Sequence, residues 1–142
     1  MIHRIIYASS AKSGLTKKDI EDILDVCRRN NSTLNITGVL FFSDGEFVQV
    51  LEGRKSDIQD LFSKISKDDR HENIEILIDE DVDNRYFSQW AMAYAVMDEN
   101  DFRSIGGSFD IRTISDFKTY LQRPDAYIGS IFSEIIDRIL DQ

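Results

Sequence analysis

Several residue types that carry chemistry are scarce in this sequence, which has one cysteine, two histidines and one proline among 142 residues. The single cysteine, Cys27, excludes an internal disulfide, and no cysteine and histidine have the spacing of zinc ligands. Neither His3 nor His71 lies near a serine or cysteine in a nucleophile motif, and no glycine-rich phosphate loop is present. We therefore expect no bound metal and none of these common catalytic classes.

Basic charge is scarce as well: 17 lysines and arginines face 26 acidic residues, which gives a net charge of −9. Nucleic-acid binding and attraction to anionic membranes both depend on basic residues, so we expect neither partner. No apolar run approaches the length that spans a bilayer, and the N-terminus lacks the pattern of a signal peptide. These features predict one cytoplasmic domain with an ordinary core.

Apolar periodicity predicts the order βαββαββ. Five strands are expected, at residues 2–8, 34–42, 46–52, 73–82 and 88–97. One helix begins at Thr16 and ends in residues 28–31, and a second begins at Ser56. Asp44-Gly45 is typical of a hairpin turn. The first six elements match the ferredoxin-like pattern, an α+β fold with two helices on one face of a sheet.

Two further helices are predicted near the C-terminus, at residues 114–122 and 126–140, separated by Pro124. The second has a wide apolar stripe, formed by Ile128, Ile131, Phe132, Ile135, Ile136, Ile139 and Leu140. A stripe of this width is expected to pack on the free face of the sheet, on another protomer, or on both.

Gln49 is the residue that most clearly needs a hydrogen-bond partner. In a strand it shares a face with Phe47 and Leu51, where a buried amide without partners costs about 1–3 kcal/mol. Tyr7 lies on the first strand, which neighbours the third in a ferredoxin-like sheet, so the two side chains are expected to meet on the helix-covered face. The alternatives are a glutamine that faces water and an ordinary core tyrosine.

Other candidates have equally simple alternatives. Asn30 and Asn31 either cap a helix or bind the polar edge of a flat ring. The charged group Asp68, Arg70 and His71 is typical of a solvated loop. Trp90 and Met92 are by default core residues, expected to share one face of the fifth strand, and Cys27 is expected to be a buried, inert thiol.

Six segments, taken together, resemble the BLUF family of blue-light sensors that bind flavin. They are IIYAS at 5–9, RRNN at 28–31, NITGVLFF at 35–42, FVQVLEG at 47–53, KDDRH at 67–71 and FSQWAM at 87–92. They occur in the order and spacing of the family. The resemblance implies a flavin-binding photosensory core at residues 1–97, with residues 98–142 as a helical extension of the same compact domain.

The resemblance also implies a photochemical site. Tyr7 would donate an electron and a proton to excited flavin, and Gln49 would bridge Tyr7 to the N5/C4=O edge. Light would leave the glutamine rearranged and its hydrogen bond to C4=O stronger, with a small red shift. Asn31 would hold the C4=O/N3 edge, with Asn30 beside it. The flavin is expected to be FAD, with FMN possible.

The remaining roles follow from the same resemblance. Ile23 and Ile65 would sandwich the ring between the two helices. The residues expected near the ribityl and phosphate side are Lys64, Asp68, Arg70 and His71. Trp90 and Met92 would be the pair on the fifth strand whose position relative to the flavin varies within the family.

The function implied is that of a photoreceptor that is not an enzyme. Residues 98–142 are too few for a cyclase or phosphodiesterase, so output is expected to pass through a homo-oligomer or a downstream protein. The alternatives are a ferredoxin-like flavin-dependent oxidoreductase or small-ligand binding module, and an interaction protein without a cofactor. A ring sandwiched by Ile23 and Ile65 argues against an oxidoreductase, because redox turnover needs space for a second substrate.

Overall fold

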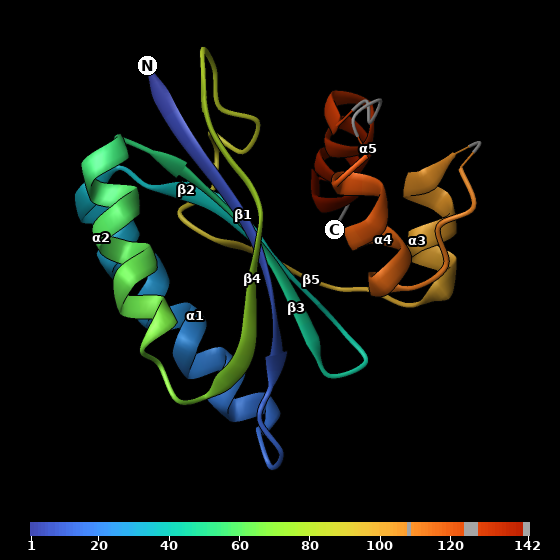
Figure 1. Ribbon diagram of the computed structural model, residues 1–142, viewed down its shortest axis with the longest axis horizontal. Coiled ribbons are helices and arrows are strands. Elements are labelled where there is room, and N and C mark those ends of the chain that lie inside the picture. Colours follow the sequence, from blue (N-terminus) through green and yellow to red (C-terminus); the bar gives the residue numbers. More distant parts are fainter. Residues whose placement is uncertain (108, 124–127, 141–142) are drawn as a thin grey trace.

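One five-stranded sheet separates two layers of helices (Figure 1). The computed structural model describes residues 1–107, 109–123 and 128–140. Residues 138–140 are described by their backbone alone. The strands are β1 (Ile2–Ala11), β2 (Thr37–Ser43), β3 (Glu46–Gly53), β4 (His71–Val82) and β5 (Ala93–Val96). The helices are α1 (Lys17–Leu34), α2 (Lys55–Ser66), α3 (Glu99–Gly106), α4 (Ile114–Leu121) and α5 (Ile128–Leu140).

The strand order is β4-β1-β3-β2-β5. Neighbouring strands are antiparallel except β2 and β5, which are parallel. Helices α1 and α2 cover one face of the sheet, and α3, α4 and α5 cover the other. The predicted α+β, ferredoxin-like architecture is therefore confirmed. Helix α3 was not predicted; a capping box formed by Asp98 and Asp101 begins it.

Strand alternation builds one core on each face, called here the α1/α2 face and the α3–α5 face. On β3, Phe47 and Leu51 belong to the α1/α2 core, whereas Val48 and Val50 belong to the α3–α5 core. Gly38 on β2 permits close approach to β3, because a Cβ there would lie 1.9 Å from the Val50 carbonyl oxygen. The central strands are thus buried on both sides, whereas the edge strand β4 has no fully buried residue.

Local signals fixed some boundaries and missed others. The capping box of Thr16 and Asp19 begins α1 as predicted, and Asp44 and Gly45 both adopt positive φ in the β2–β3 turn. The predicted end of α1 at residues 28–31 is wrong, because the left-handed residue that ends it is Asn35 (φ 55°). Helix α2 starts at Lys55, one residue before the predicted Ser56.

The apolar stripe of α5 packs within the chain. Ile131, Phe132 and Ile135 are buried in the α3–α5 core, and Ile128 and Ile136 pack against it. The Phe132 ring contacts the rings of Tyr86 and Phe87, with centroids 5.0 and 5.1 Å apart. The side chains of Ile139 and Leu140 lie outside the described residues. Packing on the free face of the sheet is confirmed for the part of the stripe that the structure describes.

A buried ion pair ties the segment before β5 to the α3–α5 face. Glu52 is fully buried and accepts hydrogen bonds from Arg4 Nε at 2.9 Å. Its two carboxylate oxygens also accept the backbone N–H groups of Tyr86 and Phe87, at 2.9 and 2.8 Å. The Arg4 guanidinium also lies over the Tyr86 ring, 4.3 Å from its centroid.

None of the helices in the described residues is long and apolar enough to cross a membrane.

Candidate functional site

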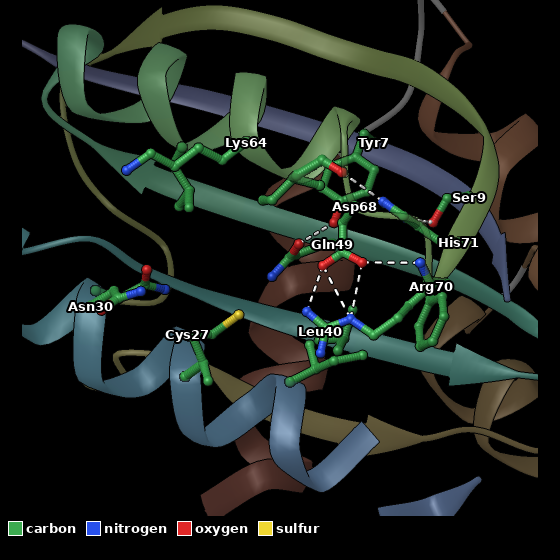
Figure 2. Close-up of a pocket in the computed structure, with 16 residues that line it drawn as sticks. Tyr7, Ser9, Cys27, Asn30, Leu40, Gln49, Lys64, Asp68, Arg70 and His71 are labelled. Atoms are coloured by element: carbon green, nitrogen blue, oxygen red, sulfur yellow. Dashed lines mark hydrogen bonds and ion pairs between the residues drawn. The ribbon is translucent and has the colours of Figure 1, made fainter. Parts of the chain in front are cut away.

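A cavity of about 190 Å³ lies between the sheet and helices α1 and α2 (Figure 2). Its lining includes every residue predicted to bind the cofactor: Ile23, Asn30, Asn31, Gln49, Lys64, Ile65, Asp68, Arg70 and His71. Tyr7 also lines it. These residues are distant in sequence, and the fold brings them together around one space.

Tyr7 and Gln49 meet at the centre of the sheet. The register of β1 and β3 pairs them directly, and the Tyr7 hydroxyl donates a hydrogen bond to Gln49 Oε1. Both side chains are buried. Burial raises the pKa of Tyr7 far above its usual value, and the nearby acidic groups of Cys27 and Asp68 raise it further. Tyr7 therefore presents a neutral hydroxyl that donates its proton toward the amide.

The other end of the Gln49 amide faces Met92. Gln49 Nε2 donates to Met92 Sδ at 3.3 Å, so both ends of the amide have a partner. Trp90 lies elsewhere, partly buried against the α3–α5 core, and neither it nor Met92 lines the cavity. The prediction that the two share a strand face is wrong, because β5 begins at Ala93 and strand alternation does not apply to residues 88–92.

Asn31 is a buried amide with an unsatisfied oxygen. Its side chain is almost wholly inaccessible, and Nδ2 donates to the Ala91 carbonyl at 2.9 Å. Oδ1 is buried and has no hydrogen-bond partner among the described residues. A buried acceptor without a partner costs about 1–3 kcal/mol, so the oxygen suits a ligand that supplies an N–H group. Asn30, one residue earlier on α1, lines the cavity with an exposed side chain.

Charged side chains stand on two sides of the cavity. Figure 2 shows Lys64 and Asn30 on one side, and Asp68, Arg70 and His71 on the other. Arg70 Nε donates to Asp68 Oδ1 at 2.9 Å, and this contact lowers the pKa of Asp68 below its usual range. Within the described residues no carboxylate pairs with Lys64. The Lys64 ammonium is therefore a cation on the cavity wall that no described carboxylate neutralises.

His71 is oriented by two fixed neighbours. Its Nε2 lies 2.8 Å from the Ile65 carbonyl oxygen, and its Nδ1 lies 2.8 Å from Ser9 Oγ. Because a carbonyl oxygen only accepts, Nε2 carries the hydrogen; in the neutral ring Nδ1 then accepts from the Ser9 hydroxyl. The ring also stands edge-on to Tyr7, with centroids 6.3 Å apart. His71 thus braces the wall beside Tyr7.

Sequence reasoning missed six further residues of the lining: Ser9, Val26, Cys27, Leu40, Phe47 and Leu61. The expectation of a buried thiol holds only in part, since Cys27 is partly buried and Figure 2 shows its sulfur directed toward the cavity. Burial still raises its pKa, so the thiol is protonated. Helical spacing could have found it, because Ile23, Cys27 and Asn31 lie four residues apart on one face of α1.

This arrangement offers a mostly apolar space lined by a tyrosine–glutamine pair and by an amide with an unsatisfied oxygen. The sequence matches the family described as "Sensors of blue-light using FAD" over residues 2–93. The chain belongs to the BLUF family. The resemblance seen in the sequence is thereby confirmed over residues 2–93, the part of the chain that the family model matches. BLUF domains are sensor modules, which also supports the expectation that this part of the chain is not an enzyme.

The relatives show how the domain is used elsewhere. The chain is 33% identical over 92 residues to the photoactivated adenylate cyclase subunit beta of Euglena longa. These residues are 64% of this chain and 11% of that protein. It is 34% identical over 80 residues to the blue light- and temperature-regulated antirepressor BluF of Escherichia coli, covering 56% of this chain and 20% of the relative. This chain thus spans only a small part of these relatives.

One solved structure is similar along nearly the whole chain. The photo-activated state of BlsA is 29% identical and superposes with a TM-score of 0.79. The similarity covers 96% of this chain and 95% of BlsA. The similarity to BlsA therefore includes the C-terminal helices as well as the sheet. The family match at residues 2–93 does not reach those helices.

Proposed function

We propose that this chain senses blue light through FAD held in the cavity between the sheet and helices α1 and α2. The observation that carries the proposal is the contact series from Tyr7 through Gln49 to Met92, beside the unsatisfied Oδ1 of Asn31. The description of the family as sensors that use FAD supports FAD over FMN. Chromatography of the flavin released on denaturation distinguishes the two.

The cavity residues divide into roles that fit a flavin. Asn31 Oδ1 would accept a hydrogen bond from a ring N–H, which would satisfy this buried acceptor. Ile23 and Ile65, one from each helix, would hold the ring between them. Lys64 provides a positive charge for a phosphate group. The set Asp68, Arg70 and His71 lines the opposite side of the cavity.

Tyr7 and Gln49 carry the photochemistry. A bound flavin supplies absorption of blue light and, when excited, a strong one-electron acceptor. With flavin bound, Tyr7 would give the electron to the excited flavin, and the proton on its hydroxyl would move toward Gln49 Oε1, which already accepts that hydrogen bond. Return of the electron and the proton to Tyr7 would leave the amide of Gln49 in a rearranged hydrogen-bond network. That rearrangement would be the signal.

Difference spectra recorded in darkness and under blue light test this function. The unmodified protein is expected to be yellow and to show a red shift of the flavin band that reverts in darkness. Tyr7→Phe and Gln49→Leu are expected to bind flavin and lose the shift. Tyr94→Phe is the matched control, since Tyr94 packs on the same face but does not line the cavity. A normal shift in Tyr7→Phe removes Tyr7 from the mechanism.

The output is proposed to leave through another protein. The Escherichia coli relative is named as an antirepressor, which supports a downstream regulatory protein as the receiver. We also propose that the chain forms a homo-oligomer in the cytoplasm, and that residues 98–142 work as part of the same domain. Light scattering in darkness and under blue light measures the assembly. An unchanged mass in both conditions leaves the partner protein as the receiver.

A further inference from the structure

Three consecutive carbonyl groups before β5 are each held by a different donor. The Trp90 carbonyl accepts from the Gly38 backbone N–H at 3.2 Å. The Ala91 carbonyl accepts from Asn31 Nδ2, and the Met92 carbonyl accepts from Arg28 Nε, both at 2.9 Å. Because residues 88–92 form no strand, these bonds replace the ladder that would otherwise fix the backbone. Helix α1 therefore sets where Met92 lies.

The position of Met92 selects one orientation of the Gln49 amide. The thioether sulfur is a weak acceptor and cannot donate, so it favours the amide NH₂ group and disfavours the amide oxygen. On the opposite side, the Tyr7 hydroxyl donates to Oε1. The orientation in the structure satisfies both neighbours, with Nε2 donating to Met92 Sδ at 3.3 Å. Displacing the sulfur removes one of the two constraints on this orientation.

Of the groups that hold these carbonyls, Arg28 is the side chain that does not line the cavity. It lies outside, in a surface groove with Trp90, Ala91 and Met92. We infer that Arg28 is a positioning residue: it holds Met92 against Gln49 and so stabilises the resting orientation of the amide. This inference rests on the proposed function, because the amide orientation is what light changes. Loss of Arg28 favours the rearranged state and slows the return to rest.

The neighbouring arginine provides a matched control. Arg28 and Arg29 are both exposed residues of α1, and each substitution by alanine removes one positive charge. Within the described residues the Arg29 side chain forms no hydrogen bond or ion pair. Both variants are expected to bind flavin like the unmodified protein. Arg28→Ala is expected to slow dark recovery at least threefold, whereas Arg29→Ala leaves it unchanged.

Arg28→Lys is the conservative variant. A lysine ammonium also donates hydrogen bonds but lacks the planar fork of arginine, so recovery is expected to lie between the unmodified protein and Arg28→Ala. Equal recovery rates in Arg28→Ala and Arg29→Ala overturn the inference. The inference is also overturned if Arg28→Ala recovers slowly and Arg28→Lys recovers no faster. The hydrogen bond to the Met92 carbonyl is then not the cause of the slow recovery.

A second measurement does not depend on flavin. The chain has three methionines, Met1, Met92 and Met97, so ¹³C-methyl methionine NMR gives three assignable signals. In the dark, flavin-free protein, Arg28→Ala is expected to shift the Met92 methyl signal and Arg29→Ala to leave it in place. An unshifted Met92 signal overturns the inference. If the unmodified protein has no photocycle, the proposed function fails while this spectrum still decides whether Arg28 positions Met92.

Discussion

Both faces of the sheet bury polar side chains, and the two faces satisfy them differently. On the α3–α5 face, Glu52 has Arg4 and two backbone N–H groups around its carboxylate. On the α1/α2 face, the Asn31 amide uses its nitrogen, while its oxygen is buried without a partner. One face has satisfied its polar group within the chain, and the other has left an acceptor unpaired.

This difference separates a structural site from a binding site. Buried polar groups in native proteins are nearly always hydrogen-bonded, so a complete network such as that of Glu52 needs no ligand. The incomplete one at Asn31 lines the cavity that also contains Tyr7 and Gln49. The α1/α2 face is thus distinguished by a buried oxygen that lacks a hydrogen-bond partner. Three experiments test the contrast between the two faces.

The largest effect is expected on the satisfied face. Glu52→Gln keeps the shape of the side chain but removes the buried carboxylate, so the buried Arg4 keeps only the exposed Glu80 as a counter-ion. This change is expected to lower the free energy of unfolding by about 3–5 kcal/mol. Glu80→Gln is the matched control, because Glu80 pairs with the same arginine at 3.3 Å on the exposed edge. That change is expected to cost about 0–1 kcal/mol. Urea denaturation measures both, and similar losses would contradict the assignment.

An intermediate effect is expected at alkaline pH. The pKa of Tyr7 is raised in the folded state, so its contribution to stability is complete below pH 10.0, the unperturbed value, and is lost as pH rises above it. Only the unfolded chain then ionises this tyrosine, and the free energy of unfolding falls by up to about 1.4 kcal/mol per pH unit.

The Tyr7→Phe variant lacks this ionisation, and its other tyrosines remain as an internal control. Urea denaturation between pH 9 and pH 11.5 is expected to show a steeper loss for the unmodified protein. Parallel curves for the two proteins would show that Tyr7 ionises as easily in the folded state as in the unfolded chain.

The smallest effect is expected at the unsatisfied amide. Asn31→Ala removes the hydrogen bond proposed between Oδ1 and the flavin, worth about 0.5–1.5 kcal/mol, which corresponds to roughly two- to tenfold weaker binding. Asn30→Ala is the matched control, since Asn30 is the neighbouring amide on the cavity wall but is exposed. It is expected to change affinity less than twofold. Flavin titration of the apoprotein compares them, and equal losses would remove the special role of Oδ1.

The sequence determined the features that depend on near neighbours in the chain. The capping box of Thr16 and Asp19, the positive-φ turn at Asp44-Gly45 and the alternation along β3 are local, so they could be predicted together with the order of strands and helices. The residues around the cavity were named because their motifs resemble a family. Helix α3 was missed, although Asp98 and Asp101 carry a capping signal.

Only the tertiary structure decided the features that depend on distant partners. Trp90 and Met92 went to different faces because Gly38, Asn31 and Arg28 hold the backbone before β5, and no pattern within residues 88–97 encodes those contacts. The end of α1 was likewise settled at Asn35, where the chain turns into β2. The unsatisfied oxygen of Asn31 became visible only after folding, because whether a polar atom has a partner depends on which segments surround it.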